Sequence, residues 1–392
     1  MALYLNDLGL LCALGNTRAE VKKRLIAGDR SGLTANDQFG TGRAVIVGEI
    51  DSPLPAIEPE YSIYDCRNNQ LLLAALRQVR TTVDGMIARF GPDRIGVVLG
   101  TSTSGVRNTE LALDYEAKNG MLPDQFHYKQ QQMGAGADFL AACLNINGPA
   151  YTLSTACSSS GKAFASARRL LNLDLCDAVI VGGADSLCRL TLNGFAALES
   201  ISASYCKPFG LHRDGINIGE AATLFVLSRQ AGPVRLLGIG ASSDAYHFSA
   251  PDPSGAAVVR AMQLALTDAG KTPDQIDYLN LHGTATALND AMESKAVNTV
   301  FGSQLPVSSS KGMTGHTLGA AAALELGFCW LLLSDNETGA LIPNINDDEP
   351  DTSLAPLNLI QKSAALGRRI NVCQSNSFAF GGNNLSIVVA RA

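Results

Sequence analysis

The sequence predicts a layered α/β protein. Short apolar runs such as residues 95–100 (IGVVLG) have the composition of buried strands, and they alternate with Ala- and Leu-rich stretches of helical spacing. Strands that are apolar along both faces are typical of largely parallel sheets covered by helices. A chain of 392 residues with 46% hydrophobic residues is long enough for several domains or for one large layered domain.

The expected elements follow from apolar periodicity and from the positions of glycine and proline. Within 157–171, for example, Ala163, Phe164 and Ala167 recur at the spacing of one helix face. The predicted strands are 95–100, 178–183, 222–228, 234–241, 276–282, 370–373 and 385–390, and the predicted helices are 157–171, 254–269 and 315–333. The polar, proline-containing stretch 335–356 predicts a surface loop.

Two similar halves are expected, because a Gly/Ser/Thr-rich turn precedes an Ala-rich helix twice, at Cys157 and at His316. We expect residues 1–230 to form an N-terminal half that carries Cys157. Residues 231–392 would then form a C-terminal half that carries His282, Lys311 and His316. The active groups would lie at the junction of the two halves.

Several functional classes are disfavoured. The net charge of −6 and the lack of a Lys/Arg run argue against a nucleic-acid partner. The most apolar stretch, 315–333, contains His316 and Glu325, so no membrane span is expected. Nine cysteines without a C-x-x-C pair predict neither disulfides nor a metal site. Nucleotide-binding motifs are also missing from the sequence. Since no targeting segment is recognisable, we expect a cytoplasmic protein.

Cys157 is the strongest candidate nucleophile. It falls where a predicted strand ends and a helix begins, and the unpaired N–H groups and dipole of a helix start favour a thiolate. We therefore expect a thiol with a lowered pKa. The alternative is a small core residue at a tight turn.

Two histidines lie in the Gly/Thr-rich segments 282–286 (HGTAT) and 311–316 (KGMTGH). His282 follows an apolar strand, at the strand end where α/β folds bind ligands. Thr284 and Thr286 offer hydroxyls to a polar, amide-bearing substrate. His316 is expected to start a helix whose dipole keeps the imidazole neutral, so that it can donate an N–H to an oxyanion. The alternative for His282 is a capping or core residue.

Lys311 has two interpretations. It is either a solvated surface charge or a buried partner of Glu325, Asp290 or Glu293. The C-terminal segment 376–384 (NSFAFGGNN) places Phe378 and Phe380 on a Gly-rich stretch. Such a loop could gate an apolar tunnel while its backbone supplies an N–H. A flexible hairpin turn is the alternative.

These segments resemble, in the same order, the elongating β-ketoacyl-acyl-carrier-protein synthases, the condensing enzymes of fatty-acid and type II polyketide assembly. The matching stretches are T-A-C-S-S at 155–159, H-G-T-A-T at 282–286 with Asp290, Lys311 with 315–321, and N-S-F-A-F-G-G at 376–382. The resemblance implies a thiolase fold, with duplicated halves in five layers, α-β-α-β-α, usually assembled as a dimer.

The resemblance also implies a two-stage reaction. Cys157 would accept an acyl chain from acyl carrier protein as a thioester. A malonyl-carrier thioester would then lose carbon dioxide, and His282 and His316 would stabilise the resulting enolate. The enolate would attack the acyl group on Cys157 and give 3-oxoacyl-carrier protein. The substrates would arrive on the carrier's phosphopantetheine, and no other cofactor would be needed.

The remaining site residues receive roles from the same resemblance. The backbone N–H groups of Cys157 and Phe380 would form the oxyanion hole. The other residues would tune the histidines, hold the phosphopantetheine arm, or gate and line the acyl tunnel. They are Lys311 with Glu325 for tuning, Thr284 and Thr286 for the arm, Phe378 and Phe380 for the gate, and Phe195 for the tunnel.

Some positions depart from the family pattern. Ala379 and Gly312 replace a usual glycine and a usual serine, which suggests a specialised polyketide enzyme, for example of polyene type. Such an enzyme can pair with a chain-length-factor-like subunit, so a homodimer and a heterodimer both remain open. Two alternative functions are a thiolase acting on coenzyme A esters and a non-catalytic chain-length subunit. The two histidines disfavour the thiolase, and the retained Cys157 disfavours the inert subunit.

Overall fold

The computed structural model describes residues 2–39, 42–347, 349 and 351–392. The strands are β1 (Leu3–Cys12), β2 (Leu33–Asn36), β3 (Val45–Gly48), β4 (Ile95–Gly100), β5 (Ala150–Leu153), β6 (Ala178–Asp185), β7 (Ile218–Gly219), β8 (Ala221–Ser228), β9 (Val234–Ser243), β10 (Tyr278–Asn280), β11 (Pro306–Ser308), β12 (Asn358–Leu359), β13 (Val372–Ala379) and β14 (Asn383–Arg391). The helices are α1 (Arg18–Ala27), α2 (Arg67–Phe90), α3 (Val106–Asn119), α4 (Ala135–Leu144), α5 (Ser159–Asn172), α6 (Arg189–Ala197), α7 (Ala256–Ala269), α8 (Ala287–Phe301), α9 (Lys311–Thr314) and α10 (Ala321–Leu333).

The large sheet consists of two halves with the same strand order. It runs β12-β11-β10-β13-β14-β9-β1-β8-β6-β4-β5, so β5-β4-β6-β8-β1 in one half corresponds to β11-β10-β13-β14-β9 in the other. In each half the first three strands are parallel and the last two are antiparallel. Antiparallel pairing of β1 with β9 at Leu3, Tyr4 and Leu5 joins the halves. A separate small sheet has the order β2-β3-β7.

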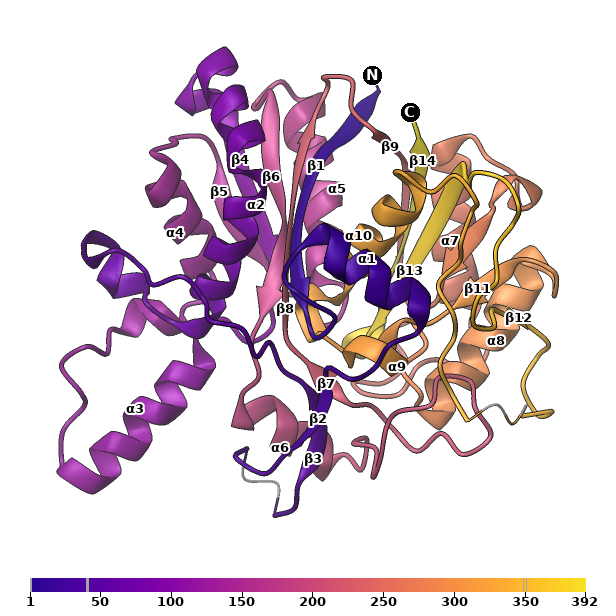
Figure 1. The fold of residues 1–392 in the computed structure, drawn as a ribbon, viewed down its shortest axis with the longest axis horizontal. Helices are drawn as coiled ribbons and strands as arrows, with labels where there is room; N and C mark the ends of the chain where they lie inside the picture. The colour runs from indigo at the N-terminus through magenta and orange to yellow at the C-terminus, as the bar shows by residue number, and fades with distance from the viewer. Residues whose placement is uncertain (1, 40–41, 348, 350) are drawn as a thin grey trace.

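Helices separate and cover the two halves of the sheet (Figure 1). Helices α2 and α4 pack on the outer face of the N-terminal half, α5 and α10 lie between the halves, and α7 and α8 cover the outer face of the C-terminal half. Strand β1 is buried on both sides, since Leu8 and Leu10 face the middle layer and Leu11 faces α2. The predicted fold, with duplicated halves in five layers, is confirmed.

Most predicted elements agree with the structure, and two differ from it. The apolar helix expected over 315–333 begins only at Ala321, because Gly315 and Leu318 have φ values of 70° and 51° and interrupt the helical path. The predicted surface loop 335–356 is wrong in part. Leu341, Ile342 and Ile345 are buried in the core, so a few apolar side chains outweigh the polar composition of the segment.

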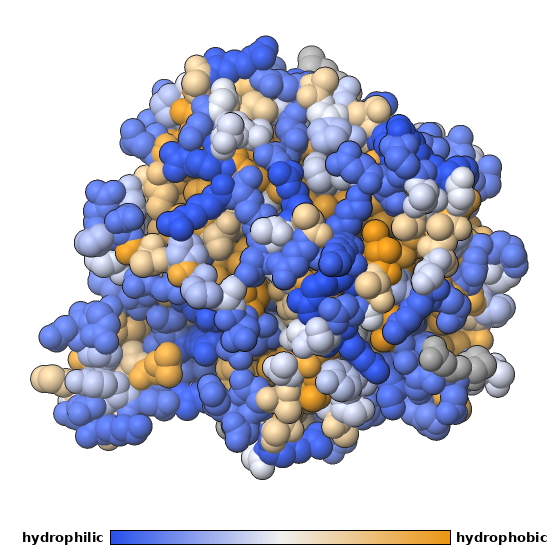
Figure 2. Space-filling view, viewed as in Figure 1, coloured by the Kyte–Doolittle hydropathy of each residue, from blue (hydrophilic) through white to orange (hydrophobic). Residues whose placement is uncertain are grey.

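The outer surface differs in character from this core. The face seen in Figure 2 is mostly hydrophilic, with apolar side chains in scattered small groups. Among the described residues, no helix has both the length and the apolar composition needed to cross a membrane.

Two glycine substitutions test the packing of the layers. Gly240 in β9 faces α7, and an added Cβ would lie 2.0 Å from the carbonyl oxygen of Ala261. We expect Gly240→Ala to lower the free energy of unfolding in urea by about 1–3 kcal/mol. Gly85 in α2 has open space around it, so Gly85→Ala should instead stabilise the protein by about 0.5–1 kcal/mol. Equal effects of the two substitutions would contradict the layer packing.

Candidate active site

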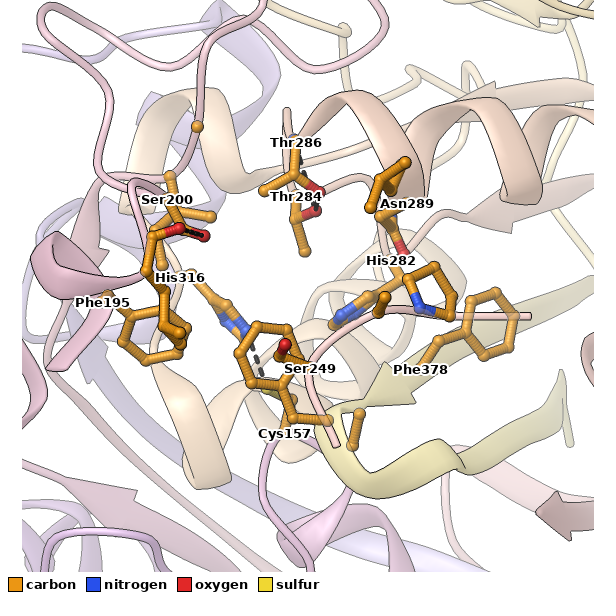
Figure 3. A pocket seen from close by; sticks show the side chains of 18 of the residues that line it. Cys157, Phe195, Ser200, Ser249, His282, Thr284, Thr286, Asn289, His316 and Phe378 are labelled. Carbon is orange, nitrogen blue, oxygen red and sulfur yellow. Dashed lines mark hydrogen bonds between the residues drawn. The ribbon is translucent and has the colours of Figure 1, made fainter. Parts of the chain in front are cut away.

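A cavity of about 350 Å³ collects residues from segments that are far apart in the sequence. In Figure 3, Cys157, His282 and His316 point toward one another from three different segments, and Thr284 and Thr286 lie across the cavity from Cys157. The predicted site residues that line this cavity are Cys157, Phe195, His282, Thr284, Thr286, His316, Phe378 and Phe380.

Cys157 sits in a tight turn between β5 and α5. Ala156, just before it, has φ of 52°, a left-handed conformation that costs about 1–2 kcal/mol for a residue other than glycine. The Ser159 hydroxyl stabilises this turn by accepting from the N–H of Thr155 at 2.8 Å and donating to the carbonyl of Ala156 at 2.5 Å. As a result the Cys157 Sγ lies 3.0 Å from Nε2 of His316 (Figure 3).

The expected lowered pKa of Cys157 is wrong for this structure. Burial raises the pKa of the thiol to about 11, and the charge of Lys311 and a hydrogen bond from the backbone N–H of Phe380 offset this only in part. Helix α5 begins at Ser159, two residues after Cys157, so its N–H groups do not outweigh desolvation. The resting thiol is therefore protonated at neutral pH, in contact with an imidazole.

Two buried carboxylates hold the backbone around His282. Glu293 accepts hydrogen bonds from the backbone N–H groups of His282 and Gly283, each at 2.7 Å. Asp290 accepts from the N–H groups of Phe209 at 2.8 Å and Ala285 at 3.2 Å. Both carboxylates therefore shape the 282–286 turn and do not pair with Lys311.

Glu325 is the ion-pair partner of Lys311. The Lys311 side chain is only 1% exposed, which excludes the solvated surface charge. Its Nζ donates to Glu325 and to the carbonyl oxygen of His282, and it lies 3.4 Å from Nδ1 of His282. This pair fixes an ammonium group directly behind one of the two imidazoles.

Both histidines are neutral. Burial, and then the charge of Lys311, lowers the pKa of His282 and of His316 well below the usual value. Neutrality was predicted for His316, but the predicted cause was the dipole of a helix that starts at His316. That cause is wrong, because α10 begins five residues later, at Ala321. The two rings are 5.4 Å apart at 84°. Each can therefore present an N–H to a common oxygen atom.

The same three side chains are also potential metal ligands. Donor atoms of Cys157, His282 and His316 lie within 4.8 Å of one another, which suits a small thiophilic cation by distance. The Lys311 ammonium close to His282 opposes a second positive charge at this place. We therefore interpret the group as a site for acyl chemistry.

The three phenylalanines predicted to gate or line the acyl tunnel differ in position. Phe195 and Phe380 contact each other with ring centroids 5.4 Å apart. Phe378 was expected on a gating loop, but it lies in β13, pairs with Asn384, and packs 5.9 Å from the His282 ring. The hairpin is paired up to Ala379 and Asn383, so only Phe380–Gly382 form the turn.

Sequence reasoning assigned no role to two buried carboxylates near the site, Asp185 and Glu220. Asp185 at the end of β6 accepts hydrogen bonds from Thr101, Thr103 and Gly319. Glu220 pairs with Arg67. The Gly-Gly-Ala-Asp sequence that closes an apolar strand was the available signal for Asp185.

Comparisons with known proteins identify the class of protein to which this site belongs. Residues 67–232 match the family described as beta-ketoacyl synthase, N-terminal domain, and residues 234–346 match the corresponding C-terminal domain. The chain belongs to the β-ketoacyl synthase family, as the sequence resemblance predicted.

Individual relatives agree with that assignment. The 3-oxoacyl-[acyl-carrier-protein] synthase 2 of Rhizobium meliloti is 34% identical over 316 residues, covering 76% of this chain and 74% of that protein. The synthase of the same name from Coxiella burnetii is 29% identical over 99% of this chain and 98% of its own length. One chain of a solved complex, the ketosynthase ApeO with its chain length factor ApeC from Xenorhabdus doucetiae, is 44% identical with a TM-score of 0.95, covering 100% of this chain and 98% of that one.

The buried carboxylates give the stability of the protein a defined pH dependence. Burial raises the pKa of Glu293 from 4.5 to about 7. The folded state thus holds this proton more tightly than the unfolded state, and its contribution to stability is lost as pH rises from 4.5 through 7. The slope is at most about 1.4 kcal/mol per pH unit for this one group.

Urea unfolding of wild type and Glu293→Gln between pH 5 and 8 checks this sign. Glu325 and Asp290 titrate in the same direction, while the two buried histidines act in the opposite direction below about pH 6.5. The expected result is therefore a difference: the variant loses less stability than wild type as the pH rises. Parallel curves would mean that Glu293 does not titrate in this range.

Proposed function

We propose that the protein is a β-ketoacyl-acyl-carrier-protein synthase that loads an acyl chain onto Cys157 and condenses it with malonyl-carrier protein to give 3-oxoacyl-carrier protein. The observation that carries the proposal is the 3.0 Å contact between Cys157 Sγ and Nε2 of a neutral His316, with neutral His282 beside it. Family membership supports the same reaction class.

In the first stage Cys157 exchanges thioesters with the acyl-carrier protein. The thiol proton passes toward His316 Nε2 as the sulfur attacks the carbonyl carbon, because an uncharged thiol is a poor nucleophile. The backbone N–H groups of Cys157 and Phe380 donate to the oxyanion of the tetrahedral intermediate. Collapse of the intermediate expels the carrier thiolate, which takes up the proton, and leaves acyl-Cys157.

In the second stage the malonyl thioester loses carbon dioxide. The C–C bond electrons form an enolate, whose oxygen accepts hydrogen bonds from His282 and His316. Lys311 and Glu325 tune the histidines by keeping them uncharged and in place. The enolate carbon then attacks acyl-Cys157, and a new C–C bond forms. The Cys157 sulfur leaves as a thiolate, which takes up a proton from solvent and returns to the resting thiol.

The other cavity residues position the substrates. The hydroxyls of Thr284 and Thr286, 3.0 Å apart, hold the amide-bearing phosphopantetheine arm. Phe195 lines the acyl tunnel against Phe380, and Phe378 shields the side of the cavity next to His282. The carrier supplies the only prosthetic group that this reaction uses.

We further propose a place for the protein in the cell and in an assembly. The solved complex in which one chain is 44% identical to this protein pairs a ketosynthase with a chain length factor. This pairing favours a heterodimer over a homodimer, and with it a type II polyketide pathway. Nine free cysteines fit the reducing cytoplasm. The division of the chain into two halves near residue 230 is supported by the strands on either side, because β8 ends at Ser228 and β9 begins at Val234.

Separate measurement of the two stages tests the histidine roles. We expect His282→Ala and His316→Ala to slow carbon dioxide release from malonyl-carrier by about 10²–10³-fold, because each removes one oxyanion donor. Acyl loading, followed by intact mass, should fall less in both variants. Equal losses in the two stages would show that the histidines act elsewhere in the cycle.

The two alternative functions make different predictions for the same proteins. A thiolase would condense coenzyme A esters without releasing carbon dioxide. A non-catalytic chain-length subunit would gain no acyl mass from acyl-carrier protein, with or without a partner subunit. We expect an acyl adduct in wild type that is missing in Cys157→Ala, and an adduct of equal amount in both would rule out Cys157 as the acceptor.

A further inference from the structure

Asp185 is a fully buried carboxylate that the proposed chemistry does not use. Its side chain accepts hydrogen bonds from the Thr101 hydroxyl at 2.5 Å, the Thr103 N–H at 2.8 Å and the Gly319 N–H at 2.6 Å. The N–H of Ser102 and the hydroxyl of Thr103 also donate to it, at 2.8 and 2.9 Å. Every one of these donors is an uncharged N–H or O–H.

These hydrogen bonds join the two halves of the protein at the active site. Thr101 follows β4, and its backbone N–H donates to Leu153, at the end of the strand that leads to Cys157. Gly319 lies three residues after His316. Asp185 is therefore a direct link between the N-terminal half next to the nucleophile and the turn that carries His316.

The link leaves no room for adjustment. An added Cβ at Gly319 would lie 2.8 Å from the Asp185 Oδ2 and 2.8 Å from the Ser102 nitrogen. An added Cβ at Gly183, two residues before Asp185, would lie 2.3 Å from the carbonyl oxygen of Gly100. Such close contacts mean that a shift of the carboxylate would be transmitted to the 316–319 turn.

We propose that Asp185 is a positioning residue that fixes the His316 turn against Cys157 and thereby sets the 3.0 Å contact between them. The inference rests on the proposed function for its rate predictions, but not for its effect on the thiol. It assigns to Asp185 a role that acts through His316 in both stages of the reaction, without contact with substrate.

Only a carboxylate meets the demands of this position. An ionised Asp is acceptor-only, which matches a shell made entirely of donors. An Asn side chain would turn an NH₂ group toward the N–H of Gly319 or toward those of Ser102 and Thr103. The mismatch would push the 316–319 turn away, while the overall volume of the side chain stays the same.

The charge of Asp185 also affects the nucleophile. Lys311 lowers the pKa of Cys157 and Asp185 raises it, and the facing imidazoles of His282 and His316 are neutral. Removal of the negative charge should therefore increase the thiolate fraction. Asp185→Asn is expected to make Cys157 more reactive toward a small alkylating agent and the enzyme slower while the melting temperature is retained, whereas loss of structure would expose the thiol and lower the melting temperature as well.

The experiment compares Asp185→Asn with wild type and with Glu220→Gln. Glu220 is a matched control, because it is also buried and accepts two backbone N–H bonds, from Ile50 and Leu187. Alkylation of Cys157 by iodoacetamide is followed by peptide mass from pH 6 to 9. Carbon dioxide release, acyl loading and the melting temperature are measured on the same preparations.

For Asp185→Asn we expect alkylation of Cys157 at pH 8 to rise by about threefold, which corresponds to a pKa drop of about half a unit. Carbon dioxide release should fall by about tenfold or more, with a smaller effect on loading. Glu220→Gln should keep the wild-type alkylation profile. A wild-type profile and rate in Asp185→Asn, or the same changes in both variants, would overturn the proposal.

A second variant covers the case in which Asp185→Asn does not fold. Thr101→Val removes only the hydroxyl that donates at 2.5 Å, and a larger loss of carbon dioxide release than of loading would support the positioning role. An unchanged rate would overturn it. If wild type itself releases no carbon dioxide, the proposed function fails, and the alkylation profiles alone then decide whether Asp185 controls Cys157.

Discussion

The close packing of α5 against α10 in the middle layer is the constraint on which the site depends. An added Cβ at Gly161 of α5 would lie 2.1 Å from Leu385 and 3.0 Å from Ala322 of α10, and the Ser160 hydroxyl accepts the N–H of Ala323 at 2.9 Å. The turns that lead into these two equivalent helices carry Cys157 and His316. Duplication of one strand–turn–helix unit, followed by packing of its copies, thus places a thiol beside an imidazole although 159 residues separate them.

Burial has two effects at this site. It keeps the Cys157 thiol protonated, and it keeps both imidazoles neutral. The buried ammonium of Lys311 is compensated by Glu325, since an unpaired buried charge would destabilise the fold by several kcal/mol. The result is a pair of buried, neutral imidazoles held in place as N–H donors, the kind of environment in which an oxyanion gains most from hydrogen bonding.

The sequence predicted the layered fold, the duplicated halves and the convergence of residues 157, 282 and 316, because apolar periodicity and short motifs are local properties. Properties that depend on three-dimensional surroundings could not be predicted in this way. The thiol pKa was wrong, since a turn next to a helix does not reveal how deeply its sulfur is buried. Phe378 was misplaced because the Gly-rich stretch hid the pairing of β13 with β14. Asp185 was missed because its donors come from two other segments, 101–103 and the turn at Gly319.

The most direct test of the central claim is a chase experiment on the acyl-enzyme. The protein is loaded from acyl-carrier protein, the adduct is located by peptide mass, and malonyl-carrier protein is then added. The account predicts an adduct on Cys157 that disappears as carbon dioxide and a carrier-bound 3-oxoacyl product, one ketide unit longer, appear together. An adduct that persists after the addition, or one located on another cysteine, would contradict it.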